Sequence, residues 1–241
     1  MKLKLTLEYD GTGFHGWARQ PGLRTVEGTL REALGVTFSR VEALSVAGRT
    51  DAGVHATGQV ASVAVEGGPP PSNAAEAVNA VLPEDVAVVL AEKAPEGFDA
   101  RLSARARSYR YRVLTGATRS PLQARRALRW GRPIDLDGLR ASAGLLLGEH
   151  DFRAFTPTET QHDVFVRDVE AADWEQVGEL LEFTITADSF LRHMVRTLVG
   201  TMLEAGAKAP ARIESLLDGR LRSEAGLTAP PHGLYLERVR Y

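Results

Sequence analysis

A glycine-rich stretch, Ala47–Val60 (AGRTDAGVHATGQV), holds the residues best suited to chemistry. Arg49, Asp51 and His55 lie close together in it, and the glycines at 48, 53 and 58 permit tight or left-handed backbone. A neighbouring arginine favours the ionised form of a carboxylate, and an ionised carboxylate in a rigid loop can act as nucleophile or base at a sugar carbon. The same residue types are also typical of a structural Asp turn. From these residues alone, Asp51 is either catalytic or structural.

Positive charge is concentrated in residues 101–132, which contain ten arginines and no aspartate or glutamate. The whole chain has a formal net charge of −2, so the remainder carries −12. An arginine-rich segment on an acidic body is typical of a surface that binds a polyanion such as nucleic acid. The alternative is a solvated surface whose arginines form salt bridges with the acidic remainder.

The N-terminal half predicts alternating strands and helices around the Asp51 loop. Leucines at 3, 5 and 7 share one face of a strand over residues 2–8, and a loop follows at 9–13. Thr25 begins a helix that reaches Phe38, and Ser72 caps a second helix that runs to Val81. Further strands are expected over residues 43–47, 57–65 and 86–91. The order β-α-β-β-α-β is that of the ferredoxin-like split βαβ arrangement.

The second half has a similar pattern. Strands are expected over residues 108–114, 164–174, 179–187 and 234–239, and helices over 136–147, 190–205 and 211–217. We therefore expect an α+β protein of two ferredoxin-like-related α/β halves, with mainly antiparallel sheets flanked by helices and a central cleft. The expected domains are 1–103, which carries the Asp51 loop, and 104–241.

Four motifs, in this order along the chain, resemble those of the tRNA pseudouridine synthase A family. The longest is GRTDAGVHA at residues 48–56, and YDGTGFHGW at 9–17 resembles the N-terminal loop of the family. The central motif is matched by FDAR at 98–101, SAR at 103–105 and YRY at 109–111. FLRHMVR at 190–196 resembles the C-terminal helix motif. Together these pieces span nearly the whole chain.

The resemblance implies a role for individual residues. It assigns the nucleophilic aspartate to Asp51, the adjacent arginine to Arg49 and the basic partner of the aspartate to Arg196. The tyrosine that stacks on the target base falls on Tyr109, with Tyr111 as the less favoured register. The family isomerises uridine in the anticodon stem-loop of tRNA, at positions 38, 39 and 40, and acts as a homodimer that holds one tRNA across both subunits.

The expected RNA contacts come from the arginine segment and the loop. We assign substrate binding to Arg101, Arg105, Arg107, Arg110 and His55, although a loop-stabilising hydrogen bond is the favoured role for His55. Extruding the uridine from its stack costs a few kcal/mol, which contacts between arginines and phosphates would partly offset.

Asp51 has three possible actions, because it could attack C1′ of the ribose, remove the 2′ proton or add to C6 of the base. Asp10 and Asp99 are candidates for a second acid, but loop and turn roles are favoured for both. The alternative functions are a non-catalytic RNA-binding protein and a hydrolytic glycosidase. Hydrolytic glycosidases generally use two carboxylates, and no convincing second one is present.

Composition restricts the remaining possibilities. The chain has no cysteine, which excludes disulfides, thiolate metal sites and cysteine nucleophiles. Its six histidines lack metal-binding spacing, and an isomerisation needs no cofactor. The N-terminus lacks the apolar stretch of a signal peptide, and no run is long enough to span a membrane. We expect a soluble, cytoplasmic protein without a metal.

Overall fold

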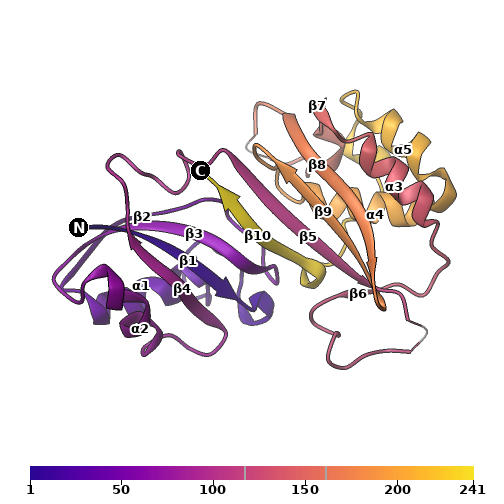
Figure 1. Cartoon of the computed structure of the whole chain (residues 1–241). Helices are drawn as coiled ribbons and strands as arrows, with labels where there is room; N and C mark the ends of the chain where they lie inside the picture. The colour runs from indigo at the N-terminus through magenta and orange to yellow at the C-terminus, as the bar shows by residue number, and fades with distance from the viewer. Residues whose placement is uncertain (117, 161) are drawn as a thin grey trace. The chain divides into compact units, whose positions relative to one another are not determined.

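The computed structural model describes residues 1–116, 118–160 and 162–241. The chain forms two compact units, each described here by itself (Figure 1). Unit 1 comprises Met1–Arg105 and Tyr235–Tyr241, and unit 2 comprises Ala106–Leu234. The last strand, which the sequence analysis put in the C-terminal domain, therefore groups with unit 1.

Unit 1 has the predicted β-α-β-β-α-β order. Its elements are β1 (Lys2–Tyr9), α1 (Val26–Thr37), β2 (Arg40–Val46), β3 (His55–Glu66), α2 (Pro71–Asn79) and β4 (Val86–Lys93). The strands run β4-β1-β3 with β2 beside β3, and all these pairs are antiparallel. β10 (Leu234–Arg240) joins in parallel at the start of β3, where Tyr235 pairs with His55. Both helices lie on one side of this sheet (Figure 1).

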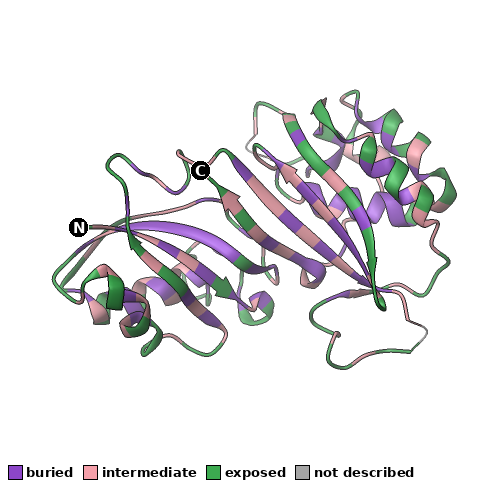
Figure 2. Ribbon diagram, in the orientation of Figure 1, coloured by how far each residue is buried: buried purple, intermediate pink, exposed green. Residues whose placement is uncertain are grey.

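Apolar periodicity explains the core of unit 1. Leu3, Leu5 and Leu7 are fully buried, as the alternation in β1 predicted. Thr25 caps α1, because its hydroxyl accepts a hydrogen bond from N of Gly28 at 3.2 Å. Figure 2 shows β3 buried along most of its length. The start of β3 and the loop before it are therefore attached to a sheet whose central strands are buried.

Helix α2 differs from the prediction at its first residue. Its N-cap is Pro70, with Pro71 as its first residue, so the predicted cap Ser72 lies inside the helix. The reason is that the fixed φ of proline suits the first turn of a helix and its missing N–H is not needed there. At the other end, the side chain of Asn79 bonds both N and O of Val88, which ties α2 to β4.

Unit 2 contains mainly antiparallel strands together with helices. Its strands run β5-β9-β8-β7, and β6 pairs in parallel with β5. Helix α3 lies along β8, and α5 packs against α3 and α4. The elements are β5 (Ala106–Leu114), β6 (Leu128–Arg129), α3 (Leu136–Gly144), β7 (Gly148–Asp151), β8 (Val166–Val177), β9 (Leu180–Ala187), α4 (Met194–Ala205) and α5 (Ala209–Leu216).

The sequence prediction for unit 2 was wrong in two places. The short strands β6 and β7 were not predicted, because two and four residues carry too little alternation to reveal a strand. Helix α4 begins at Met194 rather than at Phe190. His193 has a left-handed φ of 62°, which stops the helix from extending toward the N-terminus. Arg192 therefore precedes the helix, whereas Arg196 lies within it.

Candidate active site

The loop that carries Asp51 connects β2 to β3 and is closed by a turn. The N–H of Val54 donates to O of Asp51 at 3.2 Å. Gly53 has a φ of 77°, the left-handed conformation that the third residue of a type II turn requires. Val54 is buried, whereas Asp51 is half-buried and Arg49 is exposed. The turn thus anchors the start of β3 while leaving the Asp51 side chain partly open to solvent.

The N-terminal motif packs directly against this loop. A Cβ on Gly11 would lie 2.0 Å from O of Val54, so the position admits only glycine. The N–H of Trp17 donates to O of Thr50 at 3.0 Å, next to Asp51. The structure therefore brings together the two glycine-rich motifs that are some forty residues apart in the sequence.

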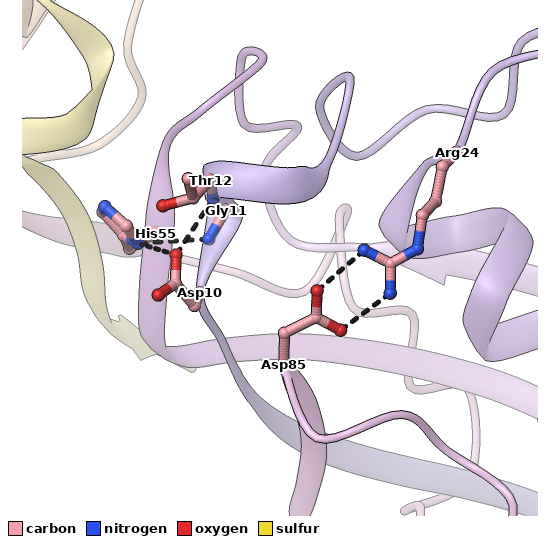
Figure 3. A network of polar contacts seen from close by, with 6 residues as sticks. All are labelled: Asp10, Gly11, Thr12, Arg24, His55 and Asp85. Carbon is pink, nitrogen blue, oxygen red and sulfur yellow. Dashed lines mark hydrogen bonds and ion pairs between the residues drawn. The ribbon is translucent and has the colours of Figure 1, made fainter. Parts of the chain in front are cut away.

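His55 is the first residue of β3, directly after the Asp51 loop, and is 3% exposed. Its Nδ1 lies 3.1 Å from N of Gly11 and 3.2 Å from Oδ1 of Asp10 (Figure 3), and its ring stacks on Tyr235 with centroids 4.7 Å apart. A backbone N–H can only donate, so the neutral ring accepts from Gly11, whereas a protonated ring would donate to Asp10. These contacts support the loop-stabilising role for His55. Its contact with substrate stays a prediction.

Arg24 and Asp85 form an ion pair next to the N-terminal motif that was not predicted from the sequence. Both carboxylate oxygens of Asp85 lie 2.7 Å from guanidinium nitrogens of Arg24 (Figure 3), and these hydrogen bonds raise the pKa of Arg24. The guanidinium also lies 4.1 Å from the ring centroid of Phe14. The strand order could have revealed this pair, because it puts the end of β1 beside the start of β4, where N of Asp10 donates to O of Asp85.

The other acidic candidates both form turns. Oδ1 of Asp10 accepts from N of Thr12 at 3.0 Å. Oδ1 of Asp99 accepts from the N–H groups of Arg101 and Leu102 at 2.8 and 2.9 Å. Burial would raise the pKa of Asp99, but these hydrogen bonds outweigh it and lower the pKa. Such geometry matches the turn roles favoured for both residues.

Tyr109, the predicted base-stacking residue, lies in β5 and is 8% exposed. The ring of Phe190 meets it edge-on, with centroids 5.0 Å apart and planes at 80°. Tyr111, the alternative register, is fully buried and donates its hydroxyl to O of Pro230 at 2.8 Å. Burial raises the pKa of Tyr111 well above its ordinary value. Tyr109 is therefore the less enclosed of the two buried rings, and its role in base stacking stays a prediction.

The arginine segment divides into two groups. The arginines of β5 are half-buried and have acceptors in unit 2: Arg110 and Arg112 form ion pairs with the buried Glu182, and Arg107 donates to O of Asp188 at 2.7 Å. The other seven are exposed, namely Arg101, Arg105, Arg119, Arg125, Arg126, Arg129 and Arg132. Glu182 of β9 therefore neutralises part of the positive charge of the segment. The sequence did not reveal that β9 is the neighbour of β5.

Arg196 is only half-buried, although it lies in the most buried part of α4. Every other residue from Met194 to Leu203 is buried, whereas Arg196 is half-buried. Its Nε donates to O of Ala229 at 2.8 Å, and N of Ala229 donates to O of Arg196 at 3.0 Å. One turn further along, a Cβ on Gly200 would lie 1.9 Å from O of Leu227. The chain before β10 therefore lies against α4 and orients Arg196.

The predicted site residues are distributed over both units. Unit 1 holds Arg49, Asp51, His55, Arg101 and Arg105, and unit 2 holds Arg107, Tyr109, Arg110 and Arg196. Among the described residues, no group of three or more His, Cys, Asp or Glu side chains could hold a metal ion. Within residues 1–116, 118–160 and 162–241, no helix has the length and apolar character needed to cross a membrane.

Several known proteins similar to this chain are named tRNA pseudouridine synthase A. Proteins named tRNA pseudouridine synthase A from Bacillus pumilus (strain SAFR-032) and Bacillus subtilis (strain 168) are 39% and 40% identical to it, and each match covers 100% of this chain and 99% of the relative. The one from Myxococcus xanthus is 42% identical over 100% of this chain and 92% of its own. A crystal structure of a Cbf5-Nop10-Gar1 complex is similar over 98% of this chain and 49% of that chain, with a TM-score of 0.44 and 14% identity, which is too weak to support an argument.

A family model described as tRNA pseudouridine synthase matches residues 6–102 and 143–241. The matched residues include the Asp51 loop and Arg196. Tyr109 and most of the arginine segment fall in the unmatched residues 103–142, but the alignments with whole relatives include them. On the family model and the full-length relatives together, this chain belongs to the tRNA pseudouridine synthase family.

Proposed function

We propose that this chain converts uridine to pseudouridine in the anticodon stem-loop of tRNA, at positions 38, 39 and 40, with Asp51 as its catalytic carboxylate. The observation that carries the proposal is a half-buried carboxylate on a loop fixed from both sides, in a chain of this family. A fixed carboxylate suits this reaction because its position relative to the ribose decides whether the base detaches.

The reaction rearranges bonds within one nucleotide. The bond from N1 of uracil to C1′ breaks, the bond from C5 to C1′ forms, C5 loses a proton and N1 gains one. Atoms and electrons balance without an oxidant, a reductant or water, so the proposal includes no cofactor. Three routes are open to Asp51: attack on C1′, removal of the 2′ proton and addition to C6. Each of them requires the carboxylate in its ionised form.

The detached uracil must be held while it turns, and we assign this role to the ring of Tyr109. Stacking a base on an aromatic ring is worth about 1–3 kcal/mol. Phe190 supports this assignment, because its edge-on contact fixes the plane of the Tyr109 ring. Arg49 and Arg196 are assigned as the basic residues of the site, as the resemblance to the family implies.

The exposed arginines supply the contacts with the tRNA backbone in this proposal. Each phosphate neutralised by an arginine releases counterions, so binding should weaken as salt increases. Arg101 and Arg105 are exposed and keep the binding role first assigned to them. Arg107 and Arg110 are half-buried and keep that role as well. We also propose a cytoplasmic homodimer that holds one tRNA across both subunits, to be tested by sedimentation with and without tRNA.

The direct experiment is to map pseudouridine in an unmodified tRNA transcript before and after incubation with the protein. The expected result is pseudouridine at positions 38, 39 or 40. Release of free uracil would instead indicate a hydrolytic glycosidase. Binding without any change in the RNA would indicate a non-catalytic RNA-binding protein.

A further inference from the structure

A buried polar network lies directly beneath the Asp51 loop. It joins the Tyr9 hydroxyl, the Thr50 hydroxyl and the Gln59 amide, which belong to residues 3%, 7% and 0% exposed. Tyr9 Oη and Thr50 Oγ1 are 2.9 Å apart, and Nε2 of Gln59 lies 3.3 Å from Tyr9 Oη. Nε2 of Gln59 also donates to O of Gly48 at 2.7 Å. The network thus holds the loop by hydrogen bonds to Gly48 and Thr50, the residues on either side of Arg49.

The chemistry of its partners fixes the orientation of the Gln59 amide. O of Gly48 can only accept and N of Val60 can only donate, so the Gln59 amide has its NH2 toward Gly48 and its oxygen toward Val60, at 2.7 and 3.1 Å. The amide then donates to the Tyr9 oxygen. Between the Tyr9 and Thr50 hydroxyls, either oxygen can be the donor.

Tyr9 reaches this position because the pairing of β1 with β3 shifts there. Leu7 pairs with Gln59, but Tyr9 pairs with Ala56, so β3 carries one extra residue between the two pairs. Such a bulge re-aims a side chain, and bulges are frequent next to active sites. Here it places the hydroxyl of Tyr9 against the residue that precedes Asp51.

The backbone of the loop is held at the same point. O of Thr50 accepts from N of Trp17 at 3.0 Å, and a Cβ on Gly16 would lie 2.9 Å from that oxygen. With its hydroxyl bound to Tyr9 and its carbonyl bound to Trp17, Thr50 is held by both its side chain and its backbone. The chain immediately before Asp51 is therefore fixed by contacts of both the side chain and the backbone of Thr50.

Space filling alone does not account for a tyrosine here. Phenylalanine would fill the same volume without burying a hydroxyl, and burying a polar group has a cost that hydrogen bonds only offset. Burial raises the pKa of Tyr9 to about 12, against the lowering effect of Thr50 and Gln59, so the phenol stays neutral and keeps its proton. A neutral hydroxyl at this place can hold the Thr50 hydroxyl either as donor or as acceptor.

We propose that Tyr9, acting through Thr50 with support from Gln59, is a positioning residue that holds the Asp51 carboxylate in its reactive orientation. The proposal rests on the proposed function of Asp51. Tyr9 touches neither substrate nor reacting atoms in this account, so its effect should be on the rate of the chemical step rather than on tRNA binding.

The test is Tyr9→Phe, which removes only the hydroxyl. Because a small misplacement of a reacting group can cost up to about 100-fold in rate, we expect kcat for pseudouridine formation to fall about 10- to 100-fold. KM for tRNA should change far less. Thr50→Val should cause a similar loss, and the double variant should be no slower than the slower single variant, because both changes break the same contact.

Tyr241→Phe is the matched control. The Tyr241 hydroxyl, also in unit 1, donates to O of Ala100 at 3.0 Å, so this variant loses a comparable hydrogen bond away from the Asp51 loop. It should keep the kcat of the wild type. An unchanged kcat in Tyr9→Phe, or an equal fall in Tyr241→Phe, would overturn the proposal.

Hydrogen exchange separates this proposal from the proposed function. Amide protons of residues 47–55 should exchange faster in Tyr9→Phe than in wild type or Tyr241→Phe, whether or not pseudouridine forms. If the wild type made no pseudouridine, the proposed function would be wrong. The hydrogen-exchange rates would still test whether the Tyr9 hydroxyl stabilises the Asp51 loop. Unchanged exchange in Tyr9→Phe would contradict the positioning role even in an active enzyme.

Discussion

The Asp51 loop and the arginine segment 101–132 carry most of the proposed function, but their contacts are of different kinds. In the loop, Gly48, Thr50 and Gly53 each form hydrogen bonds with residues from nearby motifs. In the arginine segment, the side chains of β5 pair across the sheet with Glu182 and Asp188, and the rest are exposed. A contiguous motif therefore indicates a loop with a defined geometry. A count of arginines in a segment does not reveal which of their charges are neutralised by acidic side chains.

The largest effect is expected where the two glycine-rich motifs touch. Gly11→Ala would put a Cβ 2.0 Å from O of Val54, and a clash with buried backbone should lower the free energy of unfolding by about 3 kcal/mol or more. Urea denaturation measures this. The control is Gly35→Ala in α1, which has nothing within 4 Å and should gain about 0.4–1 kcal/mol. Equal stabilities for the two variants would mean that the motifs are not packed together as described.

A smaller loss of stability is expected from the paired arginines. Glu182→Gln removes the charge that Arg110 and Arg112 share, and because those arginines are only half-buried we expect a cost of about 2 kcal/mol, below that of a fully buried pair. Asp173→Asn, at an exposed position of β8, should change stability by less than about 0.5 kcal/mol. Tighter tRNA binding by Glu182→Gln at unchanged stability would instead assign the β5 arginines to the RNA surface, because the loss of the carboxylate leaves their charge for phosphates.

The smallest effect is expected from a single exposed arginine. Arg119→Gln should leave stability unchanged and reduce the slope of log binding constant against log salt concentration by about 0.7–0.9, the loss of one phosphate contact. Lys208→Gln, which removes an exposed charge between α4 and α5, serves as the control and should keep the wild-type slope. Titrations with tRNA at several salt concentrations measure both. Identical slopes for Arg119→Gln and wild type would remove Arg119 from the RNA surface.

Much of the fold was predictable from local patterns. The leucines of β1 and the cap at Thr25 placed unit 1 elements close to their observed bounds, because alternation and capping are short-range effects. The start of α4 was not predictable, because apolar periodicity continues through Phe190 while the left-handed His193 ends the helix. β10 could not be assigned to unit 1 from sequence, since strand pairing over such a separation leaves no local signal.

The candidate site was predictable in its residues more than in its contacts. Asp51 and Arg49 came from a motif within the residues that the family model matches, whereas Tyr109 lies outside them, and the roles of all three stay predictions. The Arg24–Asp85 ion pair and the Tyr9–Thr50–Gln59 network were missed, because each joins residues that only the sheet order brings together. The pairing of Glu182 with β5 was missed for the same reason.

The central claim is that Asp51 carries out the chemistry, and Asp51→Asn tests it most directly. The variant keeps the size of the side chain and removes its charge, so pseudouridine formation in a tRNA transcript should fall by about 1,000-fold or more while tRNA binding persists. Glu84→Gln, which removes an exposed carboxylate of unit 1, should remain fully active. Pseudouridine formation by Asp51→Asn at the wild-type rate would contradict the account.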